Sequence, residues 1–421
     1  MTSPLVPTAG MDRYNGRLFL LSYLLIYLAA PVMYVGVVQA ALCDKLGASA
    51  TVANLPFAAY QLGQVAPLFF SWLVPHRHER SALGYAAVAI SVLLASVSIT
   101  LVPPIPNAFR IAVVILQGLM QGLLTSALQV FMFQCLNRGS SLEGRARALQ
   151  QTFTLGPIFA VAGSLAAQFL LNTRMPLLPY PLDFALLYGV SAILMAGVAW
   201  LSFRYRLLAV DEEPRQRLLP YLADSARAYA AIRGQVLLWV VYLLWNCTLG
   251  AVANLSLYTR EAVGRDPKDL SGLILAIRFG CKSAGGFLLG FLALRYGLRT
   301  SVLTTVLFFA GGMIWAWFAP GYFYLLAFGL LGAGELGGAY IPNLGMALSP
   351  LAAGARNMSI LTLATPSSSF APALHGWLTD RFGFRASFVF GLATALAALA
   401  LVLKIPAVKA ASPEKTDGTA G

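Results

Sequence analysis

The sequence predicts an all-α membrane protein, with roughly twelve transmembrane helices in two six-helix halves. Three observations lead to this fold class. First, 58% of the 421 residues are apolar and 11% are charged, whereas soluble chains average about 45–50% and about 25%. Second, the apolar residues gather in long runs, and runs of this length cross lipid as helices. Third, the runs fall into two sets that flank the longest polar stretch of the chain.

The predicted spans follow one another with short polar connections. Each run is long enough to cross the hydrocarbon core, which takes about 20 helical residues, and charged residues or prolines mark most of its ends. The first set lies at about 17–42, 49–74, 82–102, 109–136, 147–171 and 183–203, and the second at about 234–258, 270–294, 301–319, 321–346, 357–379 and 385–405.

The polar segments divide the chain further and suggest its orientation. The predicted segments are a cytoplasmic N-terminus (1–16), an N-terminal six-helix bundle (17–203), a cytoplasmic linker (204–233), a C-terminal six-helix bundle (234–405) and a disordered cytoplasmic tail (406–421). Most of the 29 lysines and arginines lie in loops on the side of both termini. The positive-inside rule therefore places both termini in the cytoplasm, with the chain in the cell membrane or bacterial inner membrane.

The composition also excludes several classes of function. A net charge of +13 could suggest nucleic acid, but the basic residues sit in loops between apolar runs, so we expect no nucleic-acid partner. The four cysteines and three histidines are dispersed and predict neither a disulfide framework nor a metal site. No convergent catalytic residues and no ATP-binding loop of the GxxxxGK[ST] type occur. We expect no enzyme activity and no cofactor.

Three loop and helix motifs carry a family resemblance. Residues 290–299 (GFLALRYGLR) resemble the G-x-L-x-D-R-x-G-x-R loop of the major facilitator superfamily, with Leu294 in place of the acidic residue. Residues 376–385 (GWLTDRFGFR) resemble the turn that this superfamily often has after its eleventh span, and Gly156-Pro157 is similar to its fifth-span motif. The resemblance implies a secondary transporter that works by alternating access. The loop residues expected to control cytoplasmic closure are Gly290, Arg295, Gly297 and Arg299.

Three charged residues lie inside predicted spans. Arg278 and Lys282 are four residues apart in the eighth span and share one helical face, and Glu335 lies in the tenth span. Each charge costs about 2.5–3.5 kcal/mol at mid-membrane, so they must be paired or solvated. One reading is a structural tie between Arg278 and Glu335. The other is a site for an anionic substrate, because one positive charge is left over.

The second reading predicts a small organic anion, a carboxylate, as substrate. A mid-span arginine in the eighth span is also similar to the oxalate–formate and monocarboxylate carriers. If both cations lie near Glu335, we expect this carboxylate to stay ionised and to balance them until substrate displaces it. Two alternatives stay open: a transporter of a neutral solute or drug-like compound with proton coupling through Glu335, and a non-transporting receptor or assembly factor on the same fold.

Polar and aromatic residues on helical faces complete the predicted pocket. Tyr23, Tyr27 and Tyr34 fall close together on a helical wheel of the first span, and Gln117 and Gln121 share a face of the fourth. The family resemblance implies that the first, fourth, seventh and tenth spans line the central cavity, which adds Tyr242, Asn246 and Asn343. We expect the protein to act as a monomer in the lipid bilayer. The identity of the substrate, the direction of transport and the coupling ion are left open.

Overall fold

The computed structural model describes residues 8–65, 69–70, 73–171, 178–208, 218–349 and 354–406. The predicted disordered tail lies outside the described residues except for Pro406, as do residues 1–7 of the N-terminus and residues 209–217 of the linker. Every regular element in the described part of the chain is a helix. The predicted all-α fold class is therefore confirmed.

The helices of the first half follow the predicted spans closely. They are α1 (Ala9–Leu28), α2 (Ala30–Met33), α3 (Val37–Lys45), α4 (Ala50–Gly63), the short 3₁₀ helix η1 (His76–His78), α6 (Glu79–Leu101), α7 (Asn107–Gly139), α8 (Leu142–Leu171) and α9 (Leu182–Ser202). The amphipathic helix α10 (Leu218–Ala230) stands between the halves in sequence. It carries no long apolar run, so it does not have the composition of a transmembrane helix.

The second half repeats this plan with more interruptions. Its helices are α11 (Arg233–Leu249), α12 (Val252–Val263), α13 (Pro267–Tyr296), α14 (Leu298–Phe318), the 3₁₀ helix η2 (Gly321–Leu325), α15 (Leu326–Gly334), α16 (Gly337–Ala347), α17 (Gly354–Thr362), α18 (Ala364–Ser367), α19 (Phe370–Phe382) and α20 (Phe384–Val402).

Within the described residues, nine helical segments are long and apolar enough to cross a membrane. Three further crossings lie at predicted spans but are broken or shorter: α1 to α3, α4, and α17 to α19. The sum agrees with the predicted twelve. The first of these breaks has a local cause, because Pro31 begins a new helical turn and Gly36 has a φ of 142°. That backbone conformation favours glycine, so a regular helix cannot continue through it.

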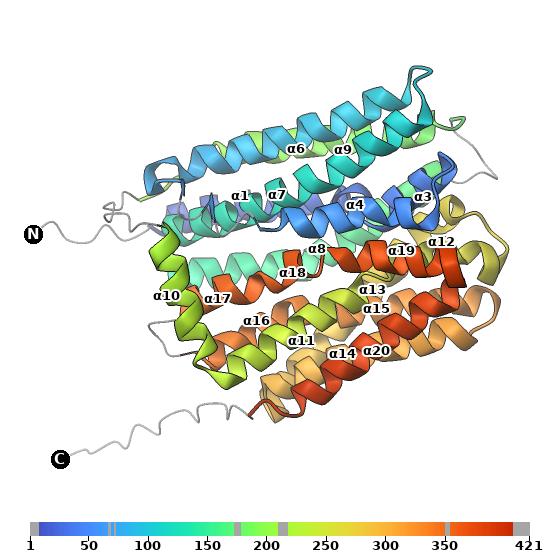
Figure 1. Ribbon diagram of the computed structural model, residues 1–421. Coiled ribbons are helices and arrows are strands. Elements are labelled where there is room, and N and C mark those ends of the chain that lie inside the picture. The colour runs from blue at the N-terminus through green and yellow to red at the C-terminus, as the bar shows by residue number, and fades with distance from the viewer. Residues whose placement is uncertain are drawn as a thin grey trace, which may run out of the picture.

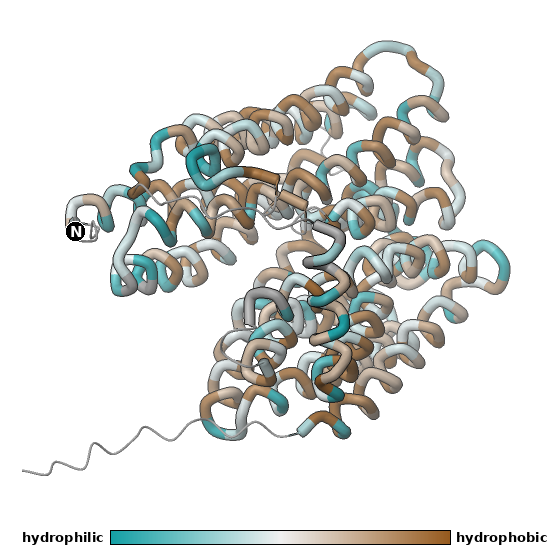
Figure 2. Tube along the Cα trace, turned by 60° about the vertical axis from the view of Figure 1, so that its left-hand side comes forward, coloured by the Kyte–Doolittle hydropathy of each residue, from teal (hydrophilic) through white to brown (hydrophobic). Residues whose placement is uncertain are grey.

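The two ends of the bundle can be told apart by the chain (Figure 1). The first and last described residues, the α7–α8 connection and the α13–α14 connection lie at one end, which we call the proximal end. The connections α3–α4, α12–α13 and α19–α20 lie at the opposite end, which we call the distal end. Figure 2 shows the two halves diverging toward the proximal end.

Polar contacts join the two halves at the distal end. Asp44 in the last turn of α3 pairs with Arg260 of α12 at 2.5 Å, and Lys45 pairs with Asp266 at 2.5 Å. The buried Lys268 of α13 pairs with Asp183 of α9. Together with the backbone contacts between α8 and α13 and between α4 and α19, these pairs hold the distal ends of the halves together.

Candidate functional site

Four crossings in which one helix ends and another begins contribute residues to one cavity. Tyr34 stands at the end of α2, Asn246 in the last turn of α11, Glu335 at the end of α15, and Thr365 within the four-residue α18. A helix that ends inside the membrane leaves backbone groups and side chains pointing into the protein interior, which is how many transporters build a substrate site. The breaks therefore mark a candidate binding site.

The cavity has a volume of about 190 Å³ and lies between the two halves. Its lining includes six of the residues predicted from the sequence: Tyr34, Tyr242, Asn246, Arg278, Lys282 and Glu335. The other lining residues are Val35, Phe57, Tyr60, Gln61, Gln64, Trp245, Leu249 and Thr365. Both halves thus contribute, the first through the end of α2 and through α4, and the second through α11, α13, α15 and α18.

The charged residues form one cluster in this cavity. Arg278 donates its Nε–H to Oε1 of Glu335, and Lys282 lies 3.4 Å from Oε2 of the same carboxylate. The Arg278 and Glu335 side chains are almost completely buried, whereas Lys282 keeps a quarter of its side chain exposed. Two cations share one anion, so the cluster carries one formal positive charge in excess. A buried excess charge favours an anion as its partner.

Aromatic rings close the cavity around this cluster. The Tyr34 ring lies 5.5 Å from the Lys282 ammonium and packs edge-on against Phe279 of α13. Trp245 of α11 stacks on Phe309 of α14 and donates its indole N–H to the carbonyl of Gly334. The rings fix the walls and offer the ammonium a cation–π contact. The predicted role of Tyr34 near the cations therefore has a geometric basis.

The other two tyrosines of the predicted face lie deeper in the first half. Tyr23 is buried in an aromatic group with Phe19, Tyr27 and Phe153. Tyr27 is close enough to Tyr34 for a side-chain hydrogen bond, but it does not line the cavity. Helical-wheel geometry predicted that the three tyrosines lie close together, and of these only Tyr34 lines the cavity.

The glutamines of the fourth span and Asn343 are not in the cavity. Gln117 donates to Gln121, which in turn donates to the carbonyl of Met33 at 2.9 Å, and both are fully buried in the first half. Gln121 thereby bonds to a backbone carbonyl of the broken first span, and neither glutamine lines the cavity that they were expected to shape. Asn343 lies on an exposed face of α16.

The predicted gate residues all make their described contacts within the second half. Gly297 joins α13 to α14 with a φ of 89°, and Arg299 donates to the carbonyls of Val402 and Leu403. Arg295 is exposed beside Tyr296, and Gly290 lies near Tyr340. These contacts tie the proximal end of the second half together. None of them reaches the first half.

Several lining residues were missed by the sequence analysis. Tyr60, Gln61 and Gln64 of α4 face the cavity, as does Thr365 of α18. The spacing of residues 57, 60, 61 and 64 is that of one helical face, so the signal was present in the second span. The family resemblance instead implies that the first, fourth, seventh and tenth spans line the cavity.

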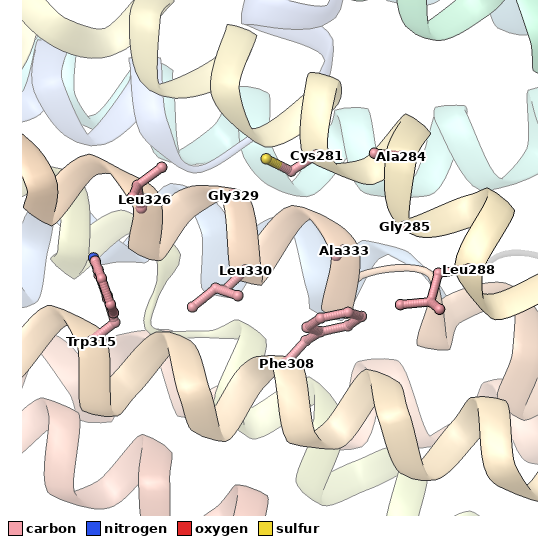
Figure 3. A pocket seen from close by; sticks show the side chains of 10 residues that line it. All are labelled: Cys281, Ala284, Gly285, Leu288, Phe308, Trp315, Leu326, Gly329, Leu330 and Ala333. Atoms are coloured by element: carbon pink, nitrogen blue, oxygen red, sulfur yellow. The ribbon is translucent and has the colours of Figure 1, made fainter.

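A larger, apolar pocket lies elsewhere in the second half (Figure 3). Its volume is about 420 Å³, and Cys281, Phe308, Trp315 and Leu330 are among the residues around it. It is formed by α13, α14 and α15 and has almost no polar groups. A site that selects its ligand needs a few placed polar groups, so the smaller cavity with the charge cluster is the better candidate. In the described part of the chain, no set of three or more metal-ligating side chains comes together.

Comparison with known proteins supports the fold. No known family model matches the sequence, and no curated protein matches it. Solved structures do match: the xylose transporter XylE from E. coli (TM-score 0.69, 13% identity, covering 96% of this chain and 100% of that chain), a mutant form of the nucleoside transporter NupG (0.67, 11%, 94% and 98%) and the POT family transporter PepTSo (0.66, 14%, 95% and 98%). The chain therefore has the major facilitator fold and is a multi-pass membrane protein.

Proposed function

We propose that this protein is a secondary or facilitative transporter that carries a small organic anion, a carboxylate, across the membrane by alternating access. The observation that carries the proposal is the cluster of Arg278, Lys282 and Glu335 in a cavity between the two halves. The fold supports transport in general, since by their titles the compared structures are a nucleoside transporter, a xylose transporter and a POT family transporter.

The charge cluster supports an anionic substrate over a neutral one. Glu335 contacts both cations, so it acts as an internal anion that holds them when the site is empty. An incoming carboxylate would replace it on Lys282, the more exposed cation, and would reach the Arg278 guanidinium, which can bind a carboxylate through two N–H groups. Because Glu335 is already ion-paired twice, we infer exchange or facilitated diffusion and not proton symport.

The arrangement of the halves supports a state open toward the proximal end. The polar contacts between halves described above lie at the distal end, and the predicted gate residues contact only their own half. With both termini in the cytoplasm of the cell membrane, as the positive-inside rule predicts, this state is inward-open. The predicted domain boundaries and the monomeric state belong to the same proposal.

The anionic substrate rests on the cluster and not on a subfamily. None of the three compared structures is an oxalate–formate or monocarboxylate carrier by its title. Their sequence identities of 11–14% show the fold alone. The proposal of an anionic substrate therefore rests on the positive charges and N–H donors of Arg278 and Lys282.

The first experiment is a thermal-shift screen of the purified protein against organic anions, neutral solutes and organic cations. A ligand at about 100 times its dissociation constant stabilises the folded state by roughly 2.7 kcal/mol. We expect a carboxylate to raise the melting temperature of the wild type and not of Arg278→Ala. The same carboxylate should then exchange across proteoliposome membranes in a counterflow assay.

The variant Glu335→Gln tests whether Glu335 stabilises the two cations in the empty site and competes with the substrate for them. It leaves Arg278 and Lys282 without their anion, so the empty protein should melt at a lower temperature and gain more from a bound carboxylate than the wild type does. A neutral solute that stabilises wild type and Arg278→Ala equally would instead favour the neutral-solute transporter. Binding with no counterflow in any condition would favour the receptor.

A further inference from the structure

The second span of the chain places an unsatisfied amide in the cavity. Gln61 of α4 is 1% exposed, and neither its Nε2 nor its Oε1 has a hydrogen-bond partner among the described residues. A buried amide without partners costs free energy, and such groups are rare in folded proteins. Gln61 therefore either destabilises the fold or forms hydrogen bonds with a ligand that is not part of the chain.

Other buried glutamines in the first half show the contrast. Gln121 bonds to Gln117 and to the backbone of Met33, and Gln39 bonds to the backbone of Val32 and Gly36. These side chains form hydrogen bonds with backbone groups of the broken first span. Gln61 has no such backbone to serve, although it lies in the same half.

The second unsatisfied group in the cavity belongs to the other half. Among the described side-chain atoms that are buried and lack a partner, those that line this cavity come from Gln61 and from Arg278, whose Nη1 is free. Arg278 uses only its Nε–H on Glu335 in the described hydrogen bonds. The first half thus offers a donor and an acceptor, and the second half offers a charged donor.

The position of Gln61 is fixed by backbone packing. A Cβ atom on Gly122 of α7 would lie 2.0 Å from the carbonyl oxygen of Tyr60, and one on Gly63 would lie 2.3 Å from the carbonyl oxygen of Leu119. The helices α4 and α7 therefore touch backbone to backbone on both sides of Gln61 in the sequence. The helix cannot rotate to give Gln61 another partner without breaking this contact.

We propose that Gln61 is the substrate contact of the first half, and that the substrate is a small carboxylate whose other end both donates and accepts a hydrogen bond, as a primary amide does. This inference rests on the proposed function. The carboxylate binds Arg278 and Lys282, and the polar end meets both atoms of the Gln61 amide. One ligand thereby touches both halves, so its release requires them to move apart.

The test uses ligand pairs that differ in one group. Succinamate and 4-oxopentanoate have the same length and charge, but a methyl group replaces the NH₂ of the amide; oxamate with pyruvate and glutaramate with 5-oxohexanoate extend the series. Dissociation constants are measured by isothermal titration calorimetry on the full chain in detergent. For the length that binds best, we expect the amide to bind at least about tenfold tighter than its ketone, as a site built around a hydrogen bond requires.

Two variants locate the effect. In Gln61→Met, which keeps the length of the side chain and removes both polar atoms, the amide should lose two hydrogen bonds and the ketone only the one that its carbonyl accepts, so the preference for the amide should disappear. Gln64→Met is the matched control, because Gln64 lines the same cavity but is paired with Tyr60. It should keep the preference. In Arg278→Ala, both members of the pair should lose affinity.

Each result separates the two proposals. If amide and ketone bind the wild type equally and both need Arg278, the role of Gln61 is overturned and the anion transporter stands. If no member of the series binds the wild type but another carboxylate from the thermal-shift screen does, the amide-ended substrate is overturned and the anion transporter stands; if no carboxylate binds in either experiment, the proposed function itself fails. The comparison on the wild type needs no variant, so a misfolded Gln61→Met would not prevent a decision.

Discussion

The two ends of this molecule use polar side chains in different ways. At the distal end, ion pairs cross from one half to the other, as Lys268 with Asp183 does. At the proximal end, the polar contacts stay inside a half: Arg138 binds Glu79 and two backbone carbonyls, and Asn15 binds the carbonyls of Gly139 and Arg206. The first kind of contact must break when the distal end opens. The second kind need not change.

This difference teaches which contacts decide the conformation. A contact that exists in one state and not in another shifts the equilibrium between them, whereas a contact present in both states affects only the stability of the fold. The distal residues should therefore control opening, and the proximal residues should not.

The distance between spin labels at Ala108→Cys and Glu261→Cys measures opening, since both positions are exposed near the distal end of different halves. Cys281→Ser removes the partly exposed thiol.

The largest effect is expected from Gly272→Leu. A Cβ atom on Gly272 of α13 would lie 2.3 Å from the carbonyl oxygen of Ser164 and 2.4 Å from the backbone nitrogen of Gln168, both in α8. The distal ends cannot then close as they do here, and the open-to-closed ratio should rise by more than about tenfold. Gly280→Leu is the matched control on the same helix, because a Cβ there meets nothing within 4 Å. An unchanged distance in Gly272→Leu would contradict the closed distal end.

A smaller opening is expected from Lys268→Met. It leaves the Asp183 carboxylate buried without its cation, which costs about 3–5 kcal/mol in comparable buried pairs. The closed distal state should lose stability, with a lower melting temperature and a longer label distance. The double variant Asp183→Asn with Lys268→Met removes both charges and should recover most of the loss. A double variant as damaged as the single one would show that packing, and not charge, is what Lys268 supplies.

Asp380→Asn should have a modest effect that depends on pH. The Asp380 carboxylate follows the predicted eleventh span and accepts hydrogen bonds from the backbone N–H groups of Ala50 and Thr51 at the start of α4. Partial burial acts to raise its pKa, but these bonds together lower the pKa below its usual value. The contact therefore stabilises the closed distal end at neutral pH, and it is lost as the pH falls below the usual range of an aspartate, about 4. The change in label distance between pH 7 and a pH below 4 should be larger in wild type than in Asp380→Asn, because other carboxylates also join the halves at this end.

No change in opening is expected from Arg138→Met. Glu79 is 2% exposed and would lose its cation, so the melting temperature should fall, as it does for other broken buried pairs. Both residues belong to the first half, however, and their contact does not span the two halves. A longer distal label distance in this variant would show that the two ends are coupled through the first half.

The charge cluster and three other lining residues, Tyr34, Tyr242 and Asn246, could be predicted from the sequence, but the part that each buried glutamine plays could not. Arg278, Lys282 and Glu335 are recognisable because charges are rare and costly inside apolar runs. Gln117 and Gln61 look alike in the sequence, since each lies in an apolar span with polar or small neighbours. What separates them is the partner that each can reach. Gln117 donates to Gln121, which bonds to the backbone of the broken first span, whereas Gln61 faces the other half.

The sequence by itself determined that this chain crosses the membrane as helices, in two halves, with an excess of positive charge at mid-span. Those properties follow from the hydropathy and charge of each segment, which do not depend on which helices pack together. Only the tertiary structure decided that four crossings break at one cavity, that Gln61 lacks a partner there, and that the halves meet at the distal end. Those features depend on how closely two helices approach and on which of their faces meet. A glycine such as Gly272 permits a close approach only where the backbone of another helix lies opposite it.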